Sequence, residues 1–101
     1  IIKLKLEDKI IEDTSNIKVF IKFLKQIGLQ KIINECNDIF TTSFLICESR
    51  NKNINISENT RCTLVKENNI NYSIFIHSSQ ADLIKRILKI SDKLNLNLLI
   101  L

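Results

Sequence analysis

Three basic side chains, Arg50, Lys52 and Arg61, lie in a polar segment between two runs that favour strands. Arg and Lys donate hydrogen bonds to phosphate oxygens, and Asn side chains can contact both phosphates and riboses. Binding of this kind needs no base stacking, and its strength falls steeply as the salt concentration rises. The residue types therefore predict contact with the backbone of a nucleic acid. Glu48 and Glu58 offset part of the positive charge, so the basic signal is small.

The segment that holds these residues runs from residue 48 to residue 69 and is too long to be a simple turn. A hairpin reverses direction within about two to five residues, and loops beyond about 12 to 15 residues are either functional or disordered insertions. The sequence leaves both interpretations open. Within the segment, residues 61–65 favour a strand, either as an arm of an extended ribbon or as a partner of the main sheet.

The strands that must position the segment are expected at residues 39–47 and 70–76, where β-branched and aromatic residues gather. Alternation assigns each side chain to one of two faces. In the first strand one face carries Phe40, Thr42, Phe44 and Ile46. In the second the inward set is Ile70, Tyr72, Ile74 and Ile76, and the outward set is Asn71, Ser73, Phe75 and His77.

The N-terminal third predicts a strand at residues 2–6, a polar connection over residues 7–15, and helical structure from residue 17 to about 34. Gly28 is expected to end the first helix, because glycine favours the position after a helix C-terminus. One face of that helix carries Lys18, Lys22 and Lys25, opposite its apolar residues. We interpret this row as a solvated face rather than a binding stripe.

The C-terminal third predicts a helix that begins after Ser79, followed by a last strand at residues 96–101. Ser79 and Asp82 match the capping box S-x-x-[DE], in which the two residues satisfy each other's backbone N–H groups. The helix then presents an apolar stripe at helical spacing, made of Leu83, Ile84, Ile87, Leu88, Ile90 and Leu94.

This order of elements predicts an α+β fold, the ferredoxin-like β-α-β-β-α-β sandwich. It has one four-stranded sheet with two helices on one face. At 101 residues, with 45% apolar and 26% charged residues, the chain fits a single domain over residues 1–101, with an extended loop at residues 48–69.

Composition argues against catalysis and against a resident cofactor. The chain has one His and one Gly, so a nucleophile–base pair and a glycine-rich phosphate loop are both hard to build. Cys36, Cys47 and Cys62 form no C-x-x-C pair and are expected to be free thiols in a reducing compartment. We predict no enzyme activity, no metal, no cofactor, no small-molecule substrate and no membrane partner. The net charge of +4 permits a nucleic-acid partner.

A second possible binding surface is the helix-free face of the predicted sheet, which would show Lys3, Lys5, Ser73, Phe75, His77, Asn95 and Asn97. An RNA-recognition motif binds single strands on such a face by stacking bases on two or three aromatic side chains. Only Phe75 is available to stack, and it could equally contact another protein. The long loop is therefore the favoured site.

The whole chain resembles the S-ten family of small-subunit ribosomal proteins, which has this order of elements at about this length. Residues 44–49, Phe-Leu-Ile-Cys-Glu-Ser, resemble the family's Phe-Thr-Val-Leu-x-Ser strand, and residues 76–83 resemble its Ile-Val-x-Pro-Thr-x-x-Thr-Val strand and helix start. The family's Gly-Pro-x-x-Leu-Pro segment has no counterpart at residues 34–41, and Arg50 and Asn51 replace its Pro and His.

The resemblance implies a structural constituent of the head of the small ribosomal subunit, with ribosomal RNA and neighbouring ribosomal proteins as partners. It implies RNA contacts at Ser49, Arg50, Asn51, Lys52 and Arg61. A diverged version from a mitochondrion, a plastid, or an AT-rich parasite or bacterium would explain the departures and the abundance of Ile, Asn and Lys. Two alternatives stay open: a standalone ferredoxin-like protein-interaction module, and a domain similar to a sliding clamp, which residues 74–101 resemble.

Overall fold

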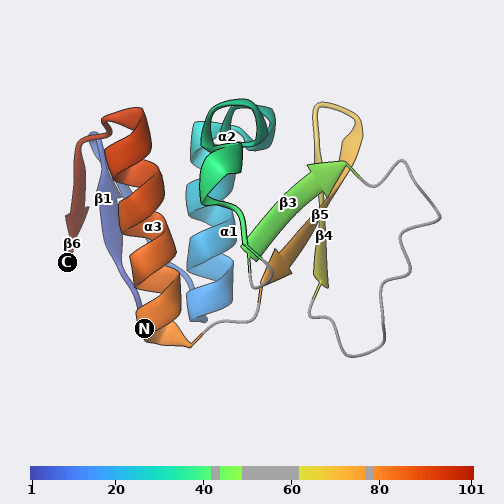
Figure 1. The fold of residues 1–101 in the computed structure, drawn as a ribbon. Coiled ribbons are helices and arrows are strands. Elements are labelled where there is room, and N and C mark those ends of the chain that lie inside the picture. Colours follow the sequence, from blue (N-terminus) through green and yellow to red (C-terminus); the bar gives the residue numbers. More distant parts are fainter. Residues whose placement is uncertain (42–43, 49–61, 77–78) are drawn as a thin grey trace. The chain divides into compact units, whose positions relative to one another are not determined.

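The computed structural model describes residues 1–41, 44–48, 62–76 and 79–101 (Figure 1). The chain divides into two compact units, Ile1–Ile39 with Ser78–Leu101, and Phe40–His77. We call them unit 1 and unit 2 and describe each by itself. The described residues form both helices and antiparallel strands, which confirms the predicted α+β class.

Unit 1 contains an antiparallel sheet of three short strands in the order β2-β1-β6. The strands are β1 (Leu4–Leu6), β2 (Lys9–Ile11) and β6 (Leu98–Ile100). The turn from β1 to β2 contains Glu7 with a φ of 54°. Residues 7–15 were predicted as a polar connection, and the presence of β2 within them corrects that prediction.

Alternation along β1 separates the two faces of this sheet. Leu4 and Leu6 are buried, whereas Lys3 and Lys5 lie on the opposite face. Lys5 is paired across the sheet with Ile10 on β2 and Leu99 on β6. These two apolar side chains are 50% and 56% exposed, so the outer face of the sheet carries apolar groups around a lysine.

Two consecutive helices follow the β1–β2 hairpin, α1 (Asn16–Ile27) and α2 (Leu29–Cys36). The Ser15 hydroxyl caps α1 by accepting the Lys18 N–H at 3.2 Å. Gly28 separates the helices with a φ of 108°, a backbone conformation that side chains with a Cβ rarely adopt. Its N–H donates to the Leu24 carbonyl, so Gly28 ends the first helix as predicted.

The third helix, α3 (Gln80–Leu94), begins at the predicted capping box. The Asp82 N–H donates to the Ser79 hydroxyl at 3.3 Å, and that hydroxyl donates to the Asp82 carboxylate at 3.3 Å. Leu83, Ile87 and Ile90 are buried, and α3 packs against both α1 and α2 (Figure 1). Leu88 belongs to the predicted apolar stripe, but its side chain is 44% exposed and lies outside the core.

Unit 2 contains a second antiparallel sheet, with strand order β3-β5-β4. Its strands are β3 (Phe44–Glu48), β4 (Cys62–Glu67) and β5 (Ile70–Ile76). Strand β4 occupies part of the predicted loop, and of the two possibilities for residues 61–65 the structure shows pairing with a sheet strand, β5. The tight turn between β4 and β5 has Asn68 and Asn69 at its centre. Both have positive φ, as a two-residue hairpin turn of type I′ requires.

The predicted inward face of this sheet is confirmed at four positions, whereas Ile70 is only half-buried. Phe44, Ile46, Tyr72 and Ile74 are at most 2% exposed. The first strand begins later than predicted, because residues 37–39 form a short 3-10 helix. Phe40 precedes the strand and packs edge-on against Phe44, with ring centroids 5.5 Å apart.

The outward face of β5 differs from the prediction. Ser73 and Phe75, both predicted to face outward, are only 3% and 9% exposed. Strand β5 is the middle strand of its sheet, so Phe75 is flanked by residues of both β3 and β4. Side chains of a middle strand are covered partly by residues of the two neighbouring strands. Alternation predicts only the face on which a side chain lies, and not this additional burial.

The prediction of one four-stranded ferredoxin-like sheet is wrong for the described strands, which form two sheets of three. The reason is edge occupancy. Strand β1 is paired on one side with β2 and on the other with β6, and β5 is paired with β3 and β4. Each middle strand has used both hydrogen-bonding edges, so neither can accept the other as a neighbour.

Candidate nucleic-acid interface

The five residues predicted to contact RNA, Ser49, Arg50, Asn51, Lys52 and Arg61, all lie outside the described residues. The prediction for them therefore stays a prediction. The alternative surface, a sheet face that stacks bases on Phe75, is not supported, because that ring is only 9% exposed. Basic side chains do meet elsewhere, in unit 1.

Strand β2 and helix α1 lie beside each other and border an open depression of about 680 Å³. Residues 9–12 line one side, and Lys22, Lys25 and Gln26 line the other. We call it the lysine depression. It brings Lys9 together with two members of the lysine row on α1, which we had interpreted as a solvated face only.

An ion pair fixes one of these lysines at the rim. The Lys22 ammonium lies 2.9 Å from the Asp13 carboxylate and donates to the Glu12 carbonyl at 3.0 Å. The same carboxylate accepts the Thr14 N–H at 2.6 Å. The hydrogen bond from Lys22, followed by that from Thr14, lowers the pKa of Asp13 to about 2. Lys22 therefore has a fixed position but a partly neutralised charge.

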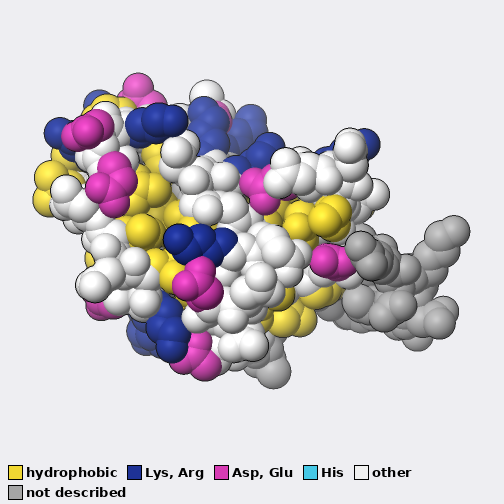
Figure 2. All heavy atoms as spheres, turned by 90° about the horizontal axis from the view of Figure 1, so that it is seen from above, with side chains coloured by type: hydrophobic (Ala, Val, Ile, Leu, Met, Phe, Trp, Pro, Cys, Tyr) yellow, Lys and Arg dark blue, Asp and Glu magenta, His cyan; other side chains and the backbone are white. Residues whose placement is uncertain are grey.

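The other two lysines are available for a ligand. Among the described residues, Lys9 and Lys25 form no ion pair, and both are exposed. Glu12, the one acidic residue that lines the lysine depression, lies 3.4 Å from the Lys3 ammonium. Three lysines and one partly compensated glutamate give the depression a local positive charge. On the face that Figure 2 shows, positive and negative side chains are interspersed.

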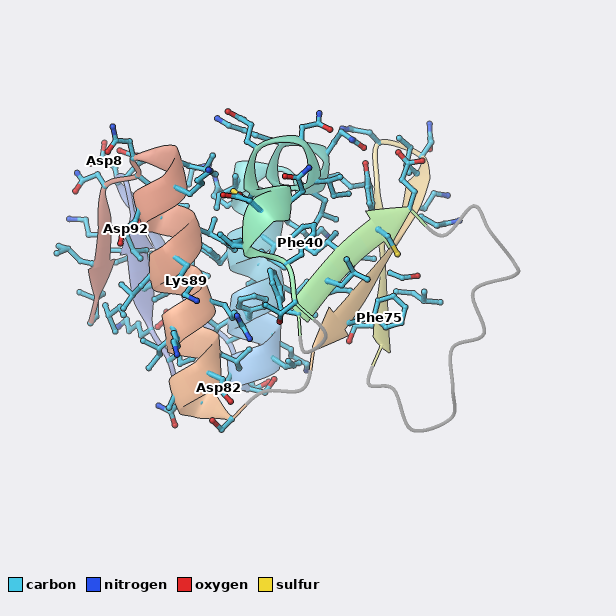
Figure 3. All side chains as sticks on the ribbon, in the orientation of Figure 1. Asp8, Phe40, Phe75, Asp82, Lys89 and Asp92 are labelled. Atoms are coloured by element: carbon cyan, nitrogen blue, oxygen red, sulfur yellow. The ribbon has the colours of Figure 1, made fainter. Side chains whose placement is uncertain are left out.

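A second depression, of about 380 Å³, adjoins the first. It is lined by residues 6–9 of the β1–β2 turn together with Gln26, Ile27, Lys31 and Leu96. We call it the turn depression. Lys9 and Gln26 line both depressions, so the two form one continuous surface. Asp8 lies in the turn (Figure 3).

Sequence reasoning missed these depressions because it missed β2. The short run Lys9-Ile10-Ile11 after the acidic pair at residues 7 and 8 was the available signal for a hairpin. Three residues are too few for alternation to stand out from a polar connection. Without β2, nothing in the sequence places Lys9 opposite α1.

The Asp13–Lys22 pair predicts a specific acid response. Because the folded-state pKa of Asp13, about 2, lies below its ordinary value of 3.8, its stabilising contribution is present above about pH 4 and is lost as the pH falls through 2. We expect D13N to lower the urea midpoint at pH 5, and the difference from the wild type to shrink at pH 2.5.

D92N is the matched control, since Asp92 lies exposed on α3 and makes no ion pair with another described residue. A difference for D13N that stays constant from pH 5 to pH 2.5 would show that the ion pair does not contribute as described.

The described residues offer little for metal or nucleophilic chemistry. They contain no group of three or more His, Cys, Asp or Glu side chains that could hold a metal ion. Cys36 is a free thiol, fully buried, and this burial raises its pKa and so disfavours the nucleophilic thiolate. None of the helices within the described part of the chain is both long enough and apolar enough to span a membrane.

Comparisons with family models, with curated proteins and with solved structures found no match for this chain.

Proposed function

We propose that this protein is a non-catalytic RNA-binding component of a ribonucleoprotein. The observation that carries the proposal is the lysine depression, where Lys9 and Lys25 face one open surface together with the positioned Lys22. Lysine ammonium groups bind phosphates as point charges, and they need no aromatic platform to do so. An open depression can receive an extended backbone, which a closed pocket would exclude.

The lysine replacements K9A and K25A, combined in one variant, test this proposal. We expect the wild type to bind a fluorescent single-stranded RNA, with an affinity that falls as salt rises. Each lost phosphate contact should make the slope of log K against log salt shallower by about 0.7, so the double variant should lose about 1.4. Fluorescence anisotropy between about 50 and 200 mM salt measures both affinity and slope.

A control variant with K18A and K89A removes the same charge from positions that line neither depression. Lys89 projects from α3 (Figure 3). If both double variants weaken binding equally, only overall charge matters, and the lysine depression is not the site. If the wild type does not bind RNA at all, the proposal fails.

The specific setting that we propose is the small ribosomal subunit, supported by the resemblance of the chain to the S-ten family. In that setting residues 48–69 would add the contacts of Arg50, Lys52 and Arg61 to those of unit 1. Sedimentation of the tagged chain through a sucrose gradient, at low and then high salt, tests it. Co-migration with small subunits after the high-salt wash supports the setting, and recovery only at the top of the gradient rejects it.

A protein-interaction module is the second candidate, favoured by the outer face of the sheet in unit 1. Ile10, Leu99 and Leu101 are each at least 50% exposed, and Lys5 lies between the first two. Such a face suits a protein partner that presents apolar side chains around a carboxylate opposite Lys5. Absence of RNA binding in the wild type would favour this candidate.

A further inference from the structure

The turn depression differs in chemistry from the lysine depression that it adjoins. Its two lysines, Lys9 and Lys31, are balanced by the carboxylates of Glu7 and Asp8. It also contains apolar surface from Leu6, Ile27 and Leu96. A balanced charge with an apolar wall does not favour a phosphate, but it does favour a flat heterocycle with polar edges.

The two carboxylates of this depression are not equivalent. A Glu7 carboxylate oxygen already accepts the Asn97 N–H at 3.2 Å, which orients that side chain. Asp8 is exposed, and its carboxylate accepts no hydrogen bond from another described residue. Asp8 is therefore the available acceptor at the rim of the depression.

Lys9 and Gln26 line both depressions, so a strand that follows the lysine depression would continue into the turn depression. A backbone whose phosphates lie along Lys25 and Lys9 would bring the next nucleotide to the turn depression. There a base could lie with one face against Ile27 and Leu96, as bases do against apolar side chains in other binding pockets. Only an unpaired base can do this, since the bases of a duplex are stacked and paired.

We propose that the turn depression receives one unpaired base of the bound RNA strand and favours cytosine over uracil through Asp8. A carboxylate accepts a hydrogen bond from the N4 amino group of cytosine. Uracil presents the O4 acceptor at the same position and so offers the carboxylate no donor there. This inference rests on the proposed RNA-binding function, and it adds base preference to that function.

The test compares oligo(C) and oligo(U) of equal length, with an RNA duplex of the same length as a third probe, by fluorescence anisotropy at pH 7.5. We expect the wild type to bind oligo(C) about fivefold more tightly than oligo(U), which is the ratio for about one hydrogen bond. The duplex should bind more weakly than oligo(C). D8N should reduce the ratio to about 1, because the amide can serve either base, and D92N should leave it unchanged.

The outcomes separate this inference from the proposed function. RNA binding that weakens in the K9A and K25A variant, but shows no preference for oligo(C), overturns the inference and leaves the function. A preference that survives in D8N also overturns it. Absence of RNA binding in the wild type overturns both.

Discussion

Replacing Ile87 by Ala should lower the free energy of unfolding by about 2 to 5 kcal/mol. Ile87 is fully buried on α3, in the helix that packs against both α1 and α2. Truncation removes apolar contacts and leaves a cavity between helices that relax only partly. Urea denaturation followed by far-UV circular dichroism measures this loss. The helical signal comes from α1, α2 and α3, which all belong to unit 1, the unit that contains Ile87.

Leu88 provides the matched control, since it is the next residue along the same helix and is 44% exposed. L88A should cost much less than I87A, about 1 kcal/mol or below, because less apolar surface is lost from the interior. Equal losses for the two variants would mean that α3 packs through a different face.

Replacing Phe44 by Ala should lower the free energy of unfolding by about 3 to 5 kcal/mol. Phe44 is fully buried in unit 2, where it lies opposite Ile76 in the sheet and meets the Phe40 ring edge-on. The variant loses the buried area of the ring and the aromatic pair. L64A is the control, since Leu64 lies in the same sheet with 69% of its surface exposed, and it should change stability by less than about 1 kcal/mol.

The intrinsic fluorescence of the protein reports on unit 2. The chain has one Tyr and no Trp, and Tyr72 is buried at 2% exposure. Unit 2, residues 40–77, is close to the length of about 40 residues below which domains need disulfides, metals or partners. We therefore expect Tyr fluorescence and circular dichroism to give coincident transitions, as the prediction of a single domain requires. Separate transitions in F44A would contradict that prediction.

The local features of the fold could be read from the sequence because their causes are local. Ser79 and Asp82 stand three residues apart and satisfy each other within one helical turn. Gly28 ends a helix because it lacks a Cβ, wherever the helix lies. The inward faces of β1 and β5 follow from alternation, which is a property of the strand itself.

The partition into two sheets could not be read in the same way. It depends on which strand takes each hydrogen-bonding edge of β1 and β5. Strand β2 lay in a segment predicted to be a polar connection, and the partner of the strand-favouring residues 61–65 was left open by the sequence. Phe75 and Leu88 were misplaced for a related reason. Periodicity gives the direction of a side chain, but burial depends on the elements that lie around it.

The candidate site shows the same division. The sequence by itself determined an excess of basic residues, the absence of residues for a phosphate loop, and a helix with a row of lysines on one face. Only the tertiary structure decided that Lys9 on β2 meets Lys22 and Lys25 of α1 around one depression, and that Asp8 and Leu96 share the next one. Side chains distant in sequence form a site when packing brings their backbones together, and packing depends on the whole chain.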